Sequence, residues 1–128
     1  MFTQTLDQSP KNRRGGGQVS HLLLASGQFG SRNLAITWVE GAPGSQQPLH
    51  ARPESEQTYV IVAGRGEMIV DGEEQAVCAG TMVMIPPGAQ HAVRNPGPDQ
   101  LIYVTAASPP FEPPSAEFAY QPADQGAP

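Results

Sequence analysis

Apolar and polar residues alternate in a series of short segments along the chain. Each segment is rich in β-branched or aromatic residues and is bounded by Gly, Pro or Asp, which is typical of β-strands. No window long enough for a sizeable helix has apolar residues at positions i, i+3, i+4 and i+7. The expected strands are Val19–Ala25, Leu34–Glu40, Gln57–Val62, Glu67–Val70, Gln75–Val77, Thr81–Ile85, His91–Arg94 and Leu101–Ala106. The pattern therefore predicts an all-β fold.

The turns between these segments narrow the architecture. Asp71-Gly72 stands between two strand patterns and predicts a hairpin with a type I′ turn, in which both central residues take positive φ. Regularly spaced short strands with Gly and Pro turns favour a sandwich or a barrel, which closes or shortens its sheet edges.

The two ends of the chain differ from its middle. Residues 1–18 are polar, include a Lys11–Arg14 cluster and a run of three glycines, and are expected to form a flexible N-terminal arm. Residues 19–107 carry the expected barrel. Residues 108–128 are rich in proline, which disfavours a core strand. The aromatic residues of this tail, Phe111, Phe118 and Tyr120, are expected to pack it on the barrel or on a partner subunit.

Length and charge exclude several classes of function. A chain of 128 residues with a formal net charge of −5 predicts one domain without the basic surface that nucleic-acid binding needs. Cys78 is the single cysteine, so no intrachain disulfide forms. The apolar runs are too short to cross a bilayer, and the N-terminus lacks a signal-peptide pattern. We therefore expect a cytoplasmic protein that contacts neither membrane nor nucleic acid.

Potential metal ligands gather in two segments of the middle region. On a strand His50 and Arg52 would share a face, and Gln57 opens the next expected strand. If His50, Gln57 and His91 face the interior, they offer two imidazoles and one amide oxygen. This set is similar to the two-histidine-one-carboxylate arrangement that holds iron or manganese, with an amide in place of the carboxylate. The positive charge of Arg52 would oppose a cation and attract an anionic substrate.

At these residues the chain resembles the cupin superfamily. The first cupin motif is Gly, five residues, His-x-His, three or four residues, Glu, six residues, Gly. Gly44, His50 and Gly64 fit it, whereas Arg52 replaces the second histidine and Gln57 replaces the glutamate. Reading Glu56 as that glutamate would leave Ala63 at the closing glycine, so the alignment favours Gln57.

The second motif fits without a departure. It is Gly, five residues, Pro-x-Gly, two residues, His, three residues, Asn, and it matches Gly80, Pro86, Gly88, His91 and Asn95. The resemblance implies a double-stranded β-helix, a small jelly-roll barrel that is commonly a homodimer. It also implies a pocket that often holds a divalent transition metal such as Mn, Fe, Ni, Zn or Cu.

Three hypotheses about function follow. The first is a small-molecule-binding cupin with a divalent metal on His50, Gln57 and His91, where Arg52 and Tyr59 contact a small anionic or polyhydroxylated substrate. Its chemistry would be that of a metal-dependent isomerase, oxygenase or decarboxylase. The alternative is a metal-free module that binds a sugar or a carboxylate without catalysis. The third is a structural or regulatory protein that acts through its dimer surface and its tail. Fold alone does not choose among them.

Overall fold

The structure is a computed structural model that describes residues 1–110 of the chain. Almost all regular structure in this part is β-strand, as the alternating pattern predicts. The strands are β1 Lys11–Arg14, β2 Gln18–Leu24, β3 Ala35–Gly41, β4 Glu56–Ala63, β5 Arg65–Val70, β6 Glu73–Cys78, β7 Met82–Ile85, β8 His91–Arg94 and β9 Leu101–Ser108. Two single-turn 3-10 helices, η1 Leu6–Gln8 and η2 Gln28–Gly30, complete the elements of residues 1–110.

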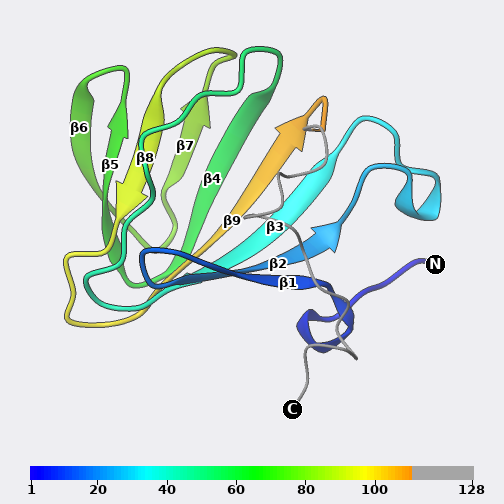
Figure 1. Cartoon of the computed structure of the whole chain (residues 1–128), viewed down its shortest axis with the longest axis horizontal. Coiled ribbons are helices and arrows are strands. Elements are labelled where there is room, and N and C mark those ends of the chain that lie inside the picture. Colours follow the sequence, from blue (N-terminus) through cyan, green and yellow to red (C-terminus); the bar gives the residue numbers. More distant parts are fainter. Residues whose placement is uncertain (111–128) are drawn as a thin grey trace.

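Two antiparallel sheets face each other (Figure 1). The large sheet has the strand order β1-β2-β3-β9-β4-β7, and the small sheet has the order β6-β5-β8. The segment between β3 and β4 extends the small sheet, because Gln46 bridges Arg94 and His50 bridges His91 in antiparallel fashion. The molecule is therefore a small jelly-roll barrel, the fold predicted from the sequence.

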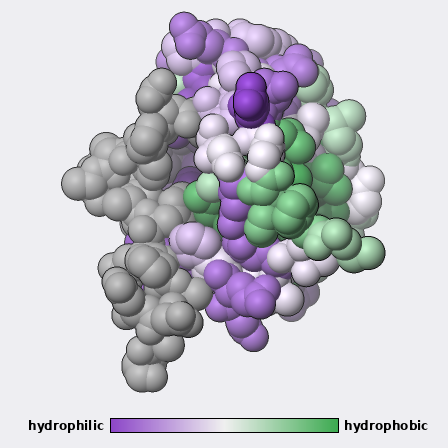
Figure 2. Space-filling model, turned by 90° about the vertical axis from the view of Figure 1, so that its right-hand side faces the viewer, coloured by the Kyte–Doolittle hydropathy of each residue, from purple (hydrophilic) through white to green (hydrophobic). Residues whose placement is uncertain are grey.

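The core lies between the two sheets. Alternate residues of each strand point inward, so Tyr59 and Ile61 of β4, Tyr103 of β9 and Met68 of β5 are all at most 2% exposed. Residues on the opposite face of the large sheet stay partly in solvent, and Val60 and Met82 are 41% and 58% exposed. Hydrophobic side chains gather in a patch on one side of the molecule (Figure 2).

Two glycine-dependent turns fix the strand connections. Asp71 and Gly72 have φ values of 47° and 83°, which confirms the positive φ at both positions that a type I′ turn requires. At Gly64 the backbone has φ 83°, and an added Cβ would lie 2.2 Å from the carbonyl oxygen of Gln100. Only glycine allows this close approach between the β4–β5 turn and the chain before β9.

The cluster Lys11–Arg14, which the sequence assigns to an N-terminal arm, forms β1 and pairs along β2. The turn between these strands is docked on the segment that carries His50. The amide of Gln46 donates to the carbonyl of Gly16 at 3.1 Å, and an added Cβ at Gly16 would meet the Gln46 carbonyl oxygen at 2.5 Å. The glycine run therefore allows β1 to approach the wall of the barrel.

The tail expected over residues 108–128 falls mostly outside the described residues. Within the described part, β9 ends at Ser108, whose neighbour Pro109 accepts a hydrogen bond from the Ser55 hydroxyl at 2.6 Å. No helix in residues 1–110 has the length and apolar character required to cross a membrane.

Candidate metal and anion site

Two histidines from distant parts of the sequence meet inside the barrel. His91 begins β8 and is completely buried, whereas His50 lies in the β3–β4 connection and is half-buried. Their backbones form a hydrogen-bonded pair: His50 N–H donates to the His91 carbonyl at 3.0 Å, and His91 N–H donates back at 2.8 Å. The ring centroids lie 4.2 Å apart with a tilt of 52°. The bridge thus holds the imidazoles next to each other.

Hydrogen bonds fix the same tautomer in both rings. The Nδ1–H of His50 donates to the Pro48 carbonyl at 2.8 Å, and that of His91 donates to the Ala89 carbonyl at 2.9 Å. Each Nε2 therefore carries a lone pair while the ring is neutral. Histidines that bind metals are commonly oriented by such a bond to the other ring nitrogen.

The surroundings keep both rings neutral. Burial lowers the pKa of His50 to about 4; the bond to Pro48 opposes this effect, and the charges of His91, Arg52 and Arg14 add to it. Burial also lowers the pKa of His91, and Arg52 contributes in the same direction. At neutral pH both imidazoles are consequently available as ligands or as hydrogen-bond acceptors.

Gln57 is the third polar group at this point. It lies on β4 opposite Ile85 of β7 and is 4% exposed, whereas the adjacent Glu56 points outward and is exposed. Its amide nitrogen Nε2 lies 3.4 Å from Nε2 of His91. Rotating the amide by 180° would place Oε1 there instead, in the orientation that a metal ligand needs. The interior position is therefore that of Gln57 and not Glu56.

Arg52 lies at the outer side of the histidine pair. Its side chain is exposed, and its carbonyl accepts a hydrogen bond from the amide of Gly88 at 3.0 Å. This bond joins the loop of the first motif to the Pro-x-Gly turn of the second. The charge of Arg52 is close enough to disfavour protonation of both His50 and His91.

Tyr59 lies in the interior, in contact with the ring of His91. Its ring meets that of His91 edge-on at 5.7 Å and stacks on Tyr103 at 5.2 Å. Its hydroxyl donates to Oε1 of Gln47 at 3.2 Å. Burial raises the pKa of Tyr59 to about 12, so the phenol stays protonated and neutral.

Two polar residues that the sequence did not single out also belong to this interior. Gln47 accepts hydrogen bonds from the Tyr59 hydroxyl and from the amide of Val93 at 3.1 Å. Arg14 of β1 acts electrostatically on both His50 and Tyr59. The third histidine, His21, pairs with Trp38 on the outer face of the large sheet. It takes no part in the site.

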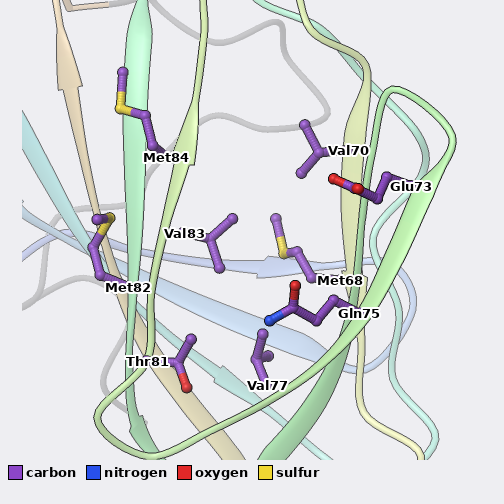
Figure 3. Close-up of a pocket in the computed structure, with 9 residues that line it drawn as sticks. All are labelled: Met68, Val70, Glu73, Gln75, Val77, Thr81, Met82, Val83 and Met84. Atoms are coloured by element: carbon purple, nitrogen blue, oxygen red, sulfur yellow. The ribbon is translucent and has the colours of Figure 1, made fainter.

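A groove of about 240 Å³ opens between the unpaired edges of β6 and β7 (Figure 3). Met68 and Val83 face each other across it, whereas Met82 and Met84 lie on the other side of β7. Two of its lining residues are strand neighbours of the site, because Val70 pairs with His91 and Val83 pairs with Tyr59. The groove thus borders the strand positions that carry His91 and Tyr59.

The donor set determines which metal site these residues could form. No cluster of three or more His, Cys, Asp or Glu side chains suitable for a metal occurs within residues 1–110. The polar side chains at this point that could hold a metal are the two imidazoles, through Nε2, and Gln57, through its amide oxygen. Such a neutral set fits a divalent transition metal that keeps open positions, with weaker binding than a set containing a carboxylate.

The barrel and its two motifs define the class of protein. Residues 37–106 match the family model of the cupin domain. The chain therefore belongs to the cupin family.

Individual relatives agree with this assignment. The chain is 34% identical over 101 residues to the polyketide synthase CurC of Streptomyces cyaneus, a match that covers 77% of this chain and 63% of that protein. An RmlC-like cupin from Shewanella frigidimarina has a similar structure, with a TM-score of 0.75 and 22% identity over 88% of this chain and 94% of that chain. The polyketide cyclase RemF from Streptomyces resistomycificus gives a TM-score of 0.74 with 18% identity, over 89% of this chain and 82% of that chain.

The curated relatives are longer than the matched region. The alignments span 54%, 65% and 63% of three of them. The likeness to the solved structures is one of fold.

Proposed function

We propose that this cupin binds a small anionic or polyhydroxylated molecule next to a divalent transition metal held by His50, His91 and Gln57. The observation that carries the proposal is the pair of neutral imidazoles, each with its Nδ1–H bound to a backbone carbonyl and its Nε2 lone pair unprotonated. Gln57 supports it, because its amide lies within 3.4 Å of the His91 nitrogen.

The metal, when bound, would act as a Lewis acid or a redox centre for isomerisation, oxygenation or decarboxylation. The chain itself positions the substrate. Arg52 at the outer side offers a guanidinium that matches a carboxylate or an enolate oxygen. Tyr59 supplies a neutral aromatic wall, and the groove along β6 and β7 takes an apolar part of the substrate. Arg52 acts on both histidines as a positive charge, and Asp71 acts on His91 as a negative one; the guanidinium is the group that would attract an anion.

Two relatives named as polyketide enzymes suggest one class of substrate to try. A compound with several carbonyl or phenol groups forms an enolate or a phenolate, and either anion suits Arg52. The groove has a mixed lining, in which Glu73, Gln75 and Thr81 stand beside Met68, Val70 and Val83. The apolar side chains among them would accommodate the carbon skeleton of such a compound. Phenolic acids therefore belong in the first set of candidate substrates.

A second candidate function is metal-free binding of a sugar or a carboxylate. It is favoured by the lack, within residues 1–110, of a group of three or more His, Cys, Asp or Glu side chains that could hold a metal ion. In this case His50, His91, Gln57 and Arg52 form a hydrogen-bonding cluster, and the imidazole Nε2 atoms accept hydrogen bonds from ligand hydroxyls.

Metal analysis of protein purified without a chelator distinguishes the two candidates. We expect close to one equivalent of a divalent transition metal per chain. A content below about a tenth of an equivalent, unchanged after incubation with Mn, Fe, Ni, Zn or Cu salts, would exclude the metal site and favour the metal-free module.

A further inference from the structure

The two faces of β1 carry different chemistry. Arg14 pairs with Gln18 and Asn12 pairs with Ser20 across the β1–β2 ladder. Gln18 and Ser20 are buried, at 3% and 0% exposure, on the face of the large sheet that forms the interior. Paired residues of neighbouring strands point to the same side of a sheet. Arg14 and Asn12 therefore point toward the barrel interior, whereas Arg13, between them, points outward and is exposed.

Asn12 holds an unsatisfied donor in this interior. The side chain is 7% exposed, and its Nδ2 has no hydrogen-bond acceptor among residues 1–110. A buried amide donor without a partner costs about 1–3 kcal/mol. A ligand that brings an acceptor oxygen to this point recovers that cost, so the position favours an oxygen-rich ligand.

Arg14 places a fixed positive charge on the same wall. Its Nε donates to the Ser20 hydroxyl at 3.1 Å, which holds the guanidinium along the inner face. Below it, Gln18 donates to the Tyr103 hydroxyl at 3.2 Å, and Tyr103 stacks on Tyr59. The wall of β1 and the histidine site are thus parts of one interior.

We propose that Arg14 and Asn12 form a carboxylate subsite on the β1 wall, so that the substrate is an organic acid whose carboxylate faces β1 while its reacting part faces His50 and His91. This inference rests on the proposed function, because it specifies the anion that the barrel binds. Residues i and i+2 of a strand lie about 7 Å apart, a gap that one carboxylate bridges between two inward side chains. A guanidinium fork and an amide N–H are both donors suited to carboxylate oxygens.

The test compares carboxylates with their amides. Benzoate, salicylate and malonate are titrated into the full chain beside benzamide, salicylamide and malonamide, and binding is followed through the Arg14 Nε–H and Asn12 side-chain amide signals in NMR spectra. We expect the acids to shift both signals. The Arg14→Gln and Asn12→Asp variants are each expected to bind the acids at least about tenfold more weakly. The amides should not respond to Arg14→Gln.

Arg13→Gln is the matched control, since Arg13 lies on the same strand and points to solvent. It should change the affinity for each acid by less than about twofold. Thermal melting verifies that each variant folds. If Arg14→Gln does not fold, Arg14→Lys carries the test, because it retains the charge, loses the fork, and should bind the acids several-fold more weakly.

The outcomes separate this inference from the proposed function. If Arg52→Gln binds the acids more weakly while Arg14→Gln and Asn12→Asp bind them as the wild type does, the β1 subsite is overturned. The proposal that the barrel binds an anion would still stand. Acids that shift neither side-chain signal would overturn the subsite too, and an absence of any binding would also remove the anion from the proposed function. Shifts at Arg14 and Asn12 in a protein that holds no metal would support the subsite while the metal proposal fails.

Discussion

The two motif segments, residues 44–64 and 80–95, contribute one histidine each but differ in how they hold it. His91 is on a strand and completely buried. Its segment also contains Asn95, whose amide donates to the carbonyls of Gly41 and Asp99 at 3.0 and 2.8 Å. His50 is half-buried in a connection that runs on to the exposed Arg52. The second segment is thus a fixed support, whereas the first presents side chains that can differ without loss of the barrel.

The difference explains where this chain departs from the motif pattern. Arg52 and Gln57 both fall in the first segment, while every matched position of the second segment is present. At Arg52, which lies in an exposed connection, an exchange of residue changes the chemistry of the site at small structural cost, whereas Gln57 is buried on β4. We therefore expect substitutions in the two segments to separate effects on stability from effects on binding.

The largest effect should follow removal of either imidazole. His91→Ala and His50→Ala are each expected to weaken metal binding by on the order of 100-fold, because a direct ligand contributes at least as much as its supporting partners. His91→Ala should also lower the free energy of unfolding by about 1–3 kcal/mol through its lost bond to Ala89. His50→Ala should have a much smaller effect on unfolding. Isothermal titration with metal and urea unfolding measure the two quantities.

His21→Ala is the control for this comparison, because His21 lies on the outer face opposite Trp38. Its metal affinity should equal that of the wild type. Equal unfolding losses in His91→Ala and His50→Ala would contradict the contrast between a fixed and a variable segment. Unchanged metal content in His91→Ala would remove this residue from the ligand set.

A smaller effect is expected from restoring a carboxylate in the first segment. Gln57→Glu replaces the neutral amide with a carboxylate, one oxygen of which takes the place of the Nε2 atom that lies 3.4 Å from Nε2 of His91. Metal affinity should rise by about tenfold, since the carboxylate adds a Coulomb attraction. Without metal the variant should be less stable, because a buried carboxylate is costly. Metal titration measures the affinity of Gln57→Glu and of the control Glu56→Gln, whose substituted residue is exposed. If both variants bind metal as the wild type does, the predicted gain in affinity is contradicted.

The smallest effect is a dependence of stability on pH in the metal-free protein. The pKa of His50 is about 4 in the folded chain, below its ordinary value of 6.5. Between these values the unfolded chain binds more protons, so the free energy of unfolding falls as the pH falls from 6.5 toward 4. His91 contributes in the same direction. Because His50 is only half-buried, we expect a loss of about 1 kcal/mol between pH 7 and pH 5.

Urea unfolding at pH 7 and pH 5 in the presence of a chelator measures this loss. His50→Gln, which cannot take up a proton in this range, should reduce it. A loss of the same size in His50→Gln would assign the pH dependence to other groups.

Much of the barrel could be predicted from the sequence because short-range rules determine it. Period-two alternation and Gly or Pro turns place the eight expected strands, and Asp71-Gly72 has the positive φ values that its turn type requires. The spacing from Gly44 to Gly64 also selects Gln57 over Glu56, and the structure buries Gln57. The strands and the turn follow from neighbours in the chain, whereas the choice of Gln57 rests on the resemblance to the first cupin motif.

Other features depended on what packs against each strand. Cysteine is a residue type that usually packs as a small buried side chain, but Cys78 is exposed on β6, an edge strand of the small sheet. Met82 and Met84 likewise face outward from β7. Alternation shows that neighbouring residues point to opposite sides, but it does not show which side another layer will cover.

The sequence by itself thus determined the strands, the turns and the histidines of the two motifs. Only the tertiary structure decided that Lys11–Arg14 would join the large sheet and that Arg14 and Asn12 would face its interior. A cluster of charged residues is ordinarily a solvated surface, because burying a charge is expensive. Here the pairing of β1 with β2 places alternate residues of the cluster on the inner face. The chemistry of that wall therefore arises from contacts that the linear order of residues does not contain.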